Sequence, residues 1–73
     1  MNNKEFLREL KGYRNLATNR EIAQKLNVTE LTIVRYQKDD YVGDDTMRSK
    51  ILKVARKIFI RKRKMLNAIS VAH

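Results

Sequence analysis

The stretch from Asn19 to Lys38 combines apolar and polar residues at a spacing that suits binding to an extended partner surface. Counted with Asn19 as the first place, the fifth place holds the small residue Ala23 and the ninth holds the turn former Asn27. The fourth, eighth, tenth, fifteenth and eighteenth places are apolar: Ile22, Leu26, Val28, Ile33 and Tyr36. This pattern is typical of a helix-turn-helix, whose two helices are anchored to one core by such residues. It leaves the outer face of residues 29–38 free for hydrogen bonds and apolar contacts with base edges in a DNA major groove.

The same stretch resembles the DNA-binding headpiece of the LacI family of repressors. Ile22-Ala23, residues 26–29 (LNVT) and residues 32–35 (TIVR) are similar to the family's V-A-x-x-A-G-V-S-x-x-T-V-S-R. Residues 41–52 (YVGDDTMRSKIL) are similar to its Y-V-S-x-x-T-R-x-x-V-L, with roughly one residue inserted. The similarity covers residues 20–58 and implies the topology of the helix-turn-helix.

Departures from the family pattern limit what the resemblance implies. Asn27 stands where the family has Gly, and Val34 stands where it has Ser, which removes an expected phosphate contact. Residues 59–64 (FIRKRK) replace the family's Gly-Tyr-x-Pro-Asn hinge. We expect an added N-terminal helix and no ligand-binding domain. Minor-groove binding by a hinge and induction by a small-molecule effector are therefore not expected.

On the topology that the resemblance implies, Glu30, Leu31 and Arg35 take positions that face base edges. Arg35 would donate a bidentate pair to guanine, Leu31 would contact a thymine methyl, and Glu30 would accept from cytosine. A second group is expected to contact phosphates: Thr18, Arg20, Thr29, Thr32 and Lys38. The alternative for each of these residues is a solvated surface side chain.

Charge is distributed unevenly along the chain. Its 17 basic and 8 acidic residues give a formal charge of +9 at pH 7. Residues 1–45 hold 8 residues of each sign, so the whole excess lies in residues 46–73, which hold 9 basic residues and no acid. Such a segment favours a polyanionic partner. Four of its residues are expected to bind DNA phosphates, each adding about 0.9 to the salt slope: Arg61, Lys62, Arg63 and Lys64.

Other interpretations of the basic segment stay open. It is a solvated helix end, or it forms a seam with a second copy through Ile58, Phe59, Met65, Leu66 and Ile69. A homodimer of that kind would place two recognition helices one DNA turn apart. We expect no membrane partner, because no apolar run approaches transmembrane length and because Arg61 and Lys62 interrupt the apolar face that a surface helix needs.

Four helices are expected to position these residues in an all-α fold. The first spans residues 3–17, and Gly12 within it marks either close approach by another helix or an early end. Thr18 to Glu21 is typical of a capping box for the second helix. Asn27 suits a left-handed turn, and Thr29 can cap a third helix over residues 30–37.

The last expected helix is long and basic. It follows a loop over residues 38–43 in which Tyr41 and Val42 pack against the core, and Asp44 or Asp45 caps it. We expect its packing against the rest of the chain to end near Phe59. Residues 1–60 then form the helix-turn-helix domain, and residues 61–73 form a basic C-terminal helix extension or tail.

Catalytic and metal-binding residues are lacking. The chain has no Cys, and its one His is His73. No nucleophile–base pair and no Gly-rich phosphate loop is visible. Asp39-Asp40 and Asp44-Asp45 lack the Gly and the terminal Glu of an EF-hand loop and are explained by turns and caps. We therefore expect no enzymatic activity and neither a metal nor a cofactor.

These patterns predict a sequence-specific double-stranded DNA-binding protein that contacts the major groove with residues 29–38. Such a small chain suits a repressor-like transcriptional regulator of phage or mobile-element type, located in the cytoplasm and on the nucleoid. One alternative is an architectural or excisionase-like DNA binder, which would bend its DNA. Another is a protein-interaction adaptor that uses its basic helix.

Overall fold

The computed structural model describes residues 3–71, with side chains over residues 3–69, and these residues form helices joined by short connections. The helices are α1 (Asn3–Tyr13), α2 (Asn19–Leu26), α3 (Glu30–Tyr36) and α4 (Asp45–Val71). No strand occurs within residues 3–71. The prediction of an all-α fold with a long C-terminal helix is confirmed.

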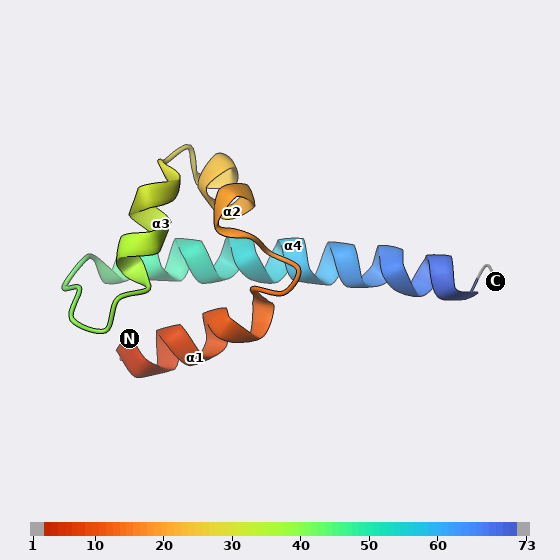
Figure 1. Ribbon diagram of the computed structural model, residues 1–73, viewed down its shortest axis with the longest axis horizontal. Coiled ribbons are helices and arrows are strands. Elements are labelled where there is room, and N and C mark those ends of the chain that lie inside the picture. The colour runs from red at the N-terminus through yellow and green to blue at the C-terminus, as the bar shows by residue number, and fades with distance from the viewer. Residues whose placement is uncertain (1–2, 72–73) are drawn as a thin grey trace.

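The long helix α4 is the axis on which the other helices are arranged. Figure 1 shows α1 along one side of the first half of α4, with α2 and α3 on the opposite side. The second half of α4 projects beyond the other three helices, which gives the molecule its elongated shape of 46 × 23 × 16 Å. No helix within residues 3–71 has both the length and the apolar character needed to span a membrane.

One apolar core joins all four helices. Its fully or nearly fully buried members are Phe6, Leu10, Ala17, Ile22, Ala23, Ile33, Tyr36, Ile51, Leu52 and Ala55. Each large side chain among them stabilises the fold by about 1.5–3 kcal/mol relative to leaving it exposed. Because α2 and α3 both contribute to this core, the helix-turn-helix is anchored to α4 through shared buried residues.

Helix α1 ends at Tyr13, earlier than the predicted end at residue 17. The amides of Leu16 and Ala17 both donate to the Tyr13 carbonyl, at 3.1 and 2.8 Å, and the chain turns so that Ala17 is fully buried. A Cβ placed on Gly12 would meet no atom within 4 Å, so this glycine serves no close approach. Its low helix propensity, about 1 kcal/mol below Ala, instead favours the early end.

The loop before α4 differs from its prediction at Val42. Tyr41 is half-buried, as expected, and its ring meets that of Tyr36 edge-on with centroids 4.9 Å apart. Val42, however, is 86% exposed, so the prediction that it packs against the core was wrong. The backbone of this residue faces inward instead, because its carbonyl accepts a hydrogen bond from a buried guanidinium.

That guanidinium belongs to Arg48, which is 5% exposed and whose role the sequence pattern does not predict. Its Nη2 donates to the carbonyls of Tyr41 and Val42, at 2.8 and 2.6 Å, and its Nη1 pairs with the Asp45 carboxylate at 3.0 Å. The Tyr36 ring centroid lies 5.4 Å from the guanidinium carbon. One basic residue of the charged C-terminal half therefore stabilises the loop and cannot contact a partner.

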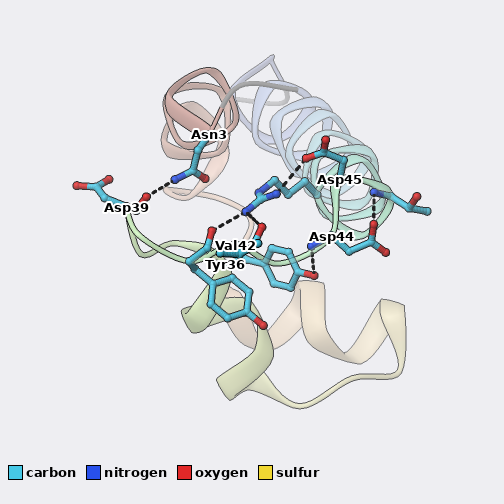
Figure 2. A network of polar contacts seen from close by, with 9 residues as sticks. Asn3, Tyr36, Asp39, Val42, Asp44 and Asp45 are labelled. Atoms are coloured by element: carbon cyan, nitrogen blue, oxygen red, sulfur yellow. Dashed lines mark hydrogen bonds and ion pairs between the residues drawn. The ribbon is translucent and has the colours of Figure 1, made fainter.

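Further polar contacts fix both ends of this loop (Figure 2). The side-chain amide of Asn3 donates from Nδ2 to the Asp39 carbonyl at 2.7 Å, which ties the start of α1 to the loop. The Asp44 amide donates to the Tyr36 hydroxyl at 2.9 Å, and the Asp44 carboxylate accepts from the Thr46 amide at 3.1 Å. Asp44 thus caps α4, and the end of α3 is held against the start of α4.

Helix α4 continues without a break through residue 60, where the predicted domain boundary falls. The Tyr13 and Phe59 rings pack with centroids 5.3 Å apart. One turn further on, Lys62 Nζ lies 2.6 Å from a carboxylate oxygen of Glu21. Apolar packing of α4 thus reaches Phe59, near which it was expected to end, and the Lys62–Glu21 ion pair follows it.

Candidate nucleic-acid interface

The turn between α2 and α3 has the geometry that the sequence predicts. Asn27 adopts the left-handed conformation, with φ 57° and ψ 44°. The Val28 amide donates to the Ala23 carbonyl at 3.0 Å, which closes α2. Thr29 then caps α3, since its hydroxyl accepts from the Thr32 amide at 3.3 Å. Ala23 is 3% exposed and belongs to the shared core.

Helix α3 has one buried face and one exposed face. Ile33 and Tyr36 are buried in the core, whereas Leu31 and Val34 are 55% and 38% exposed. After the helix, Gln37 Nε2 donates to Asn19 Oδ1 at 2.6 Å and to the Ile33 carbonyl at 3.3 Å. The end of α3 is therefore linked to the start of α2, which fixes the orientation of the exposed face.

The three residues predicted to contact bases lie on that exposed side. Glu30, Leu31 and Arg35 are all exposed. Leu31 and Arg35 are four residues apart and share one face, while Glu30 lies in the first turn. Within residues 3–69, no hydrogen bond or ion pair engages the Arg35 side chain, which leaves its donors available.

Val34 belongs to the same face and was not among the predicted contacts. It lies three residues from Leu31, and together they form a small apolar patch beside Arg35. The helical spacing of Val34 from Leu31 is the signal in the sequence that places Val34 on this face. Compared with the family pattern, Val34 stands out only as a departure from Ser. An exposed apolar pair of this size suits contact with thymine methyl groups.

Residues predicted to contact phosphates differ in how free their side chains are. Arg20 and Lys38 are exposed. The Thr29 and Thr32 hydroxyls lie 3.0 Å apart and share one hydrogen bond. The Thr18 hydroxyl donates to a Glu21 carboxylate oxygen at 2.9 Å and accepts from the Glu21 amide at 3.2 Å. The capping box is thus present, and it occupies the hydroxyl that was expected to contact phosphate.

Glu21 is the centre of a polar cluster at the start of α2. Its Oε1 accepts from the Thr18 amide at 3.2 Å, from the Thr18 hydroxyl and from Lys62 Nζ. The hydrogen bond from Lys62 is the largest influence on the pKa of this carboxyl; together with the Thr18 bonds it outweighs partial burial and lowers that pKa. Lys62 and the Thr18 hydrogen bonds offset the negative charge of Glu21 at the N-terminus of α2. This is the helix end where contact with DNA phosphate was expected.

The predicted basic run Arg61 to Lys64 is divided among different surroundings. Lys62 is held in the ion pair with Glu21, and the Arg63 guanidinium carbon lies 5.9 Å from the Phe59 ring centroid. Arg61 and Lys64 are exposed. Figure 1 shows α3 beside the first half of α4, whereas residues 61–64 lie further along α4, on the part that projects beyond α2. The structure therefore does not bring the basic run together with Glu30, Leu31 and Arg35.

The residues predicted to mediate self-association also differ in their surroundings. Ile58 and Phe59 are half-buried and pack within the chain. Met65, Leu66 and Ile69 are 58%, 52% and 56% exposed on the projecting part of α4. Only these last three residues present a largely open apolar surface.

Comparison with protein-family models, with curated proteins and with solved structures gave no match for this chain. The resemblance to the LacI headpiece therefore depends on the quoted residues alone. Among the described residues, no three His, Cys, Asp or Glu side chains are grouped so as to hold a metal ion.

Proposed function

We propose that this chain is a sequence-specific double-stranded DNA-binding protein that inserts α3 into the major groove. The observation that carries the proposal is the division of α3 into two faces behind a left-handed turn. Ile33 and Tyr36 anchor the helix in the core, while Leu31, Val34 and Arg35 point outward. A small transcriptional regulator that acts by occupying its site is the role that suits such a chain.

Arg35 supplies the directional contact in this proposal. Its guanidinium is exposed and unpaired within the described residues, so it can donate two hydrogen bonds to O6 and N7 of guanine. Such a pair discriminates against the wrong base by about 1–3 kcal/mol. Leu31 and Val34 add apolar contact with neighbouring thymine methyls. Together these residues would define a short recognition site.

Affinity would come largely from outside this face, because residues 1–45 have no net charge. Arg61, Arg63 and Lys64 extend beyond α2 on the projecting half of α4 and would meet phosphates that flank the recognition site. Contacts with phosphates add affinity without sequence preference and weaken with salt. Specificity and affinity are thus assigned to different parts of the chain.

Selection of bound duplexes from a random pool tests the proposal. We expect a short enriched site, and we expect a palindromic arrangement if the chain binds as a dimer. Arg35→Ala should lose preference at a guanine, whereas Arg8→Ala removes an exposed Arg from α1 and should select the same site. If no sequence is enriched and the chain binds heparin as tightly as duplex DNA at about 0.15 M salt, the proposal is wrong and the chain binds polyanions without specificity.

A further inference from the structure

A groove lies between α2 and the middle of α4, and no residue of α3 lines it. Its volume is about 1280 Å³, and it is lined by residues of these two helices only. The α2 side is formed by Glu21, Gln24 and Lys25. The α4 side extends from Val54 to Met65.

The floor of the groove is apolar. Val54 and Ile58 are half-buried at the edge of the core, and Met65 continues their side of α4 with 58% of its surface exposed. Leu66 and Ile69 follow on the projecting end. Val54, Ile58 and Met65 form an apolar stripe of the kind that a helix presents to a neighbouring helix, and Arg61 and Lys62 interrupt this stripe between Ile58 and Met65. Here α1 and α2 end before the stripe does, so its last turns lack a neighbour within the described chain.

The rims of the groove are basic. Lys57, Arg61 and Lys64 recur at helical spacing along α4, and Lys25 faces them from α2. Among the described residues that line the groove, Glu21 is the only acid, and Lys62 already neutralises it. The groove therefore carries an excess of positive charge above an apolar floor.

We propose that this groove binds an acidic amphipathic helix of a partner protein. Its apolar side would cover Val54, Ile58 and Met65, and its carboxylates would pair with Lys57, Arg61 and Lys64. Charge complementarity favours this occupant over a second copy, because residues 46–73 contain no acid and two such helices repel one another. The apolar floor disfavours DNA, whose phosphates would gain nothing from covering it.

The position of the groove on α2 makes it compatible with DNA binding by α3. Asn19 contacts Gln37 at the end of α3, whereas Glu21 contacts Lys62 of α4. Residues two apart on a helix point in directions about 160° apart, so α3 and the groove lie on different flanks of α2. The proposal does not depend on DNA binding. Arg61 and Lys64 are also among the residues proposed to contact flanking phosphates, so the partner helix would compete with those phosphates while the base contacts of α3 stay available.

A synthetic peptide tests this proposal on the full chain. The probe is a labelled amphipathic helix of about 14 residues, with a Leu stripe on one face and Glu on its flanks. The control peptide has the same composition but a scrambled stripe. By fluorescence anisotropy at about 0.15 M salt we expect the striped peptide to bind about ten-fold more tightly than the scrambled one. In NMR spectra, the striped peptide should shift the Met65 methyl signal.

Charge reversals in the protein locate the binding. The double variant Lys57→Glu/Arg61→Glu should weaken binding of the striped peptide about ten-fold or more. The control Lys53→Glu/Arg63→Glu changes the charge of exposed residues on the same helix outside the groove and should bind almost as well. Circular dichroism of both variants confirms that they fold.

Other results would overturn the proposal. These are equal binding of the two peptides, no binding of either, or no effect of the groove reversal. A chain that sediments as a dimer and excludes the peptide would assign the groove to a second copy. A duplex that displaces the peptide and whose binding is weakened by Lys57→Glu alone, at a residue outside the proposed phosphate contacts, would assign the groove to DNA. A failure of DNA binding would leave this proposal standing.

Discussion

Lys62 of α4 and Glu21 of α2 form an ion pair in which Nζ lies 2.6 Å from Oε1. Glu21 is also the acid of the capping box that begins α2. One carboxylate therefore closes the N-terminus of the first helix of the helix-turn-helix and joins it to the basic helix. A movement of the projecting part of α4 would therefore displace the start of α2.

Removal of this ion pair should destabilise the fold modestly. The two side chains are 37% and 34% exposed, so we expect Lys62→Met to lower the free energy of unfolding by about 0.2–1 kcal/mol. Urea denaturation measures the change. Lys64→Met removes an exposed Lys from the same helix and should leave stability nearly unchanged. Equal stability of Lys62→Met and the parent chain would show that the pair contributes nothing.

The stabilisation by Lys62 should depend on pH in a defined direction. Because Lys62 lowers the pKa of Glu21 in the folded chain, the pair stabilises the protein fully above the ordinary value of 4.5. The contribution is lost as pH falls from 4.5 through the lowered pKa. The difference in unfolding free energy between the parent chain and Lys62→Met should therefore shrink below pH 4.5 and stay constant above pH 6 or so. A difference that grows on acidification would contradict this.

Arg48 should be among the most sensitive residues of the fold. Arg48→Met leaves the inward-facing carbonyls of Tyr41 and Val42 without their donor, and we expect a loss of about 3 kcal/mol of stability. Arg48→Lys should rescue only part of this, because an ammonium cannot reproduce the planar set of donors. Thermal denaturation followed by circular dichroism measures both variants. Parent-like stability of Arg48→Met would show that water replaces the guanidinium without loss.

Asn27 offers a test of the turn between α2 and α3. Its positive φ is one that Gly adopts freely, so Asn27→Gly should retain stability close to that of the parent chain. Asn27→Ala should lose about 1 kcal/mol, because a Cβ without a polar group is disfavoured in the left-handed conformation. Gly is also the residue that the LacI-type pattern has at this place. Higher stability of the Ala variant would contradict the turn geometry.

Sequence patterns predicted the local structure well where a single residue type governs the backbone. Thr18, Asn27 and Thr29 each have the capping or turn role expected of them, because caps and left-handed turns depend on few residues. The end of α1 at Tyr13 precedes the predicted end at residue 17, although Gly12 had indicated an early end as one of two alternatives. The exposure of Val42 was not predicted, because it depends on the hydrogen bond that its carbonyl accepts from the buried Arg48, which periodicity along the chain does not encode.

The candidate interface was predictable in part for the same reason. The exposure of Glu30, Leu31 and Arg35 follows from helical spacing once Ile33 and Tyr36 are placed in the core. The ion pair between Lys62 and Glu21 does not follow from helical spacing, because these residues are 41 positions apart in the sequence. A run of four basic residues looks uniform in the sequence, whereas the fold gives each member different surroundings.

The basic run should affect DNA affinity but not sequence preference. Replacing Arg61, Arg63 and Lys64 by Gln keeps the Lys62–Glu21 pair and should reduce the slope of log K against log salt by about 2.7 if all three contact phosphates. Truncation after Ile60 should also weaken binding and flatten the slope, with some loss of stability in addition. Selection from a random duplex pool should enrich the same site for the parent chain and the triple variant. A changed site would show that the run contributes to recognition.

The most direct test of the proposed function is binding of Arg35→Ala to the site that the parent chain selects. We expect affinity for that site to fall by about ten-fold or more and discrimination at one guanine to disappear, while non-specific binding to unrelated duplex stays the same. The variant should fold as the parent does, since Arg35 is exposed and unpaired within the described residues. Undiminished affinity for the selected site, with the same base preference, would contradict insertion of α3 into the major groove.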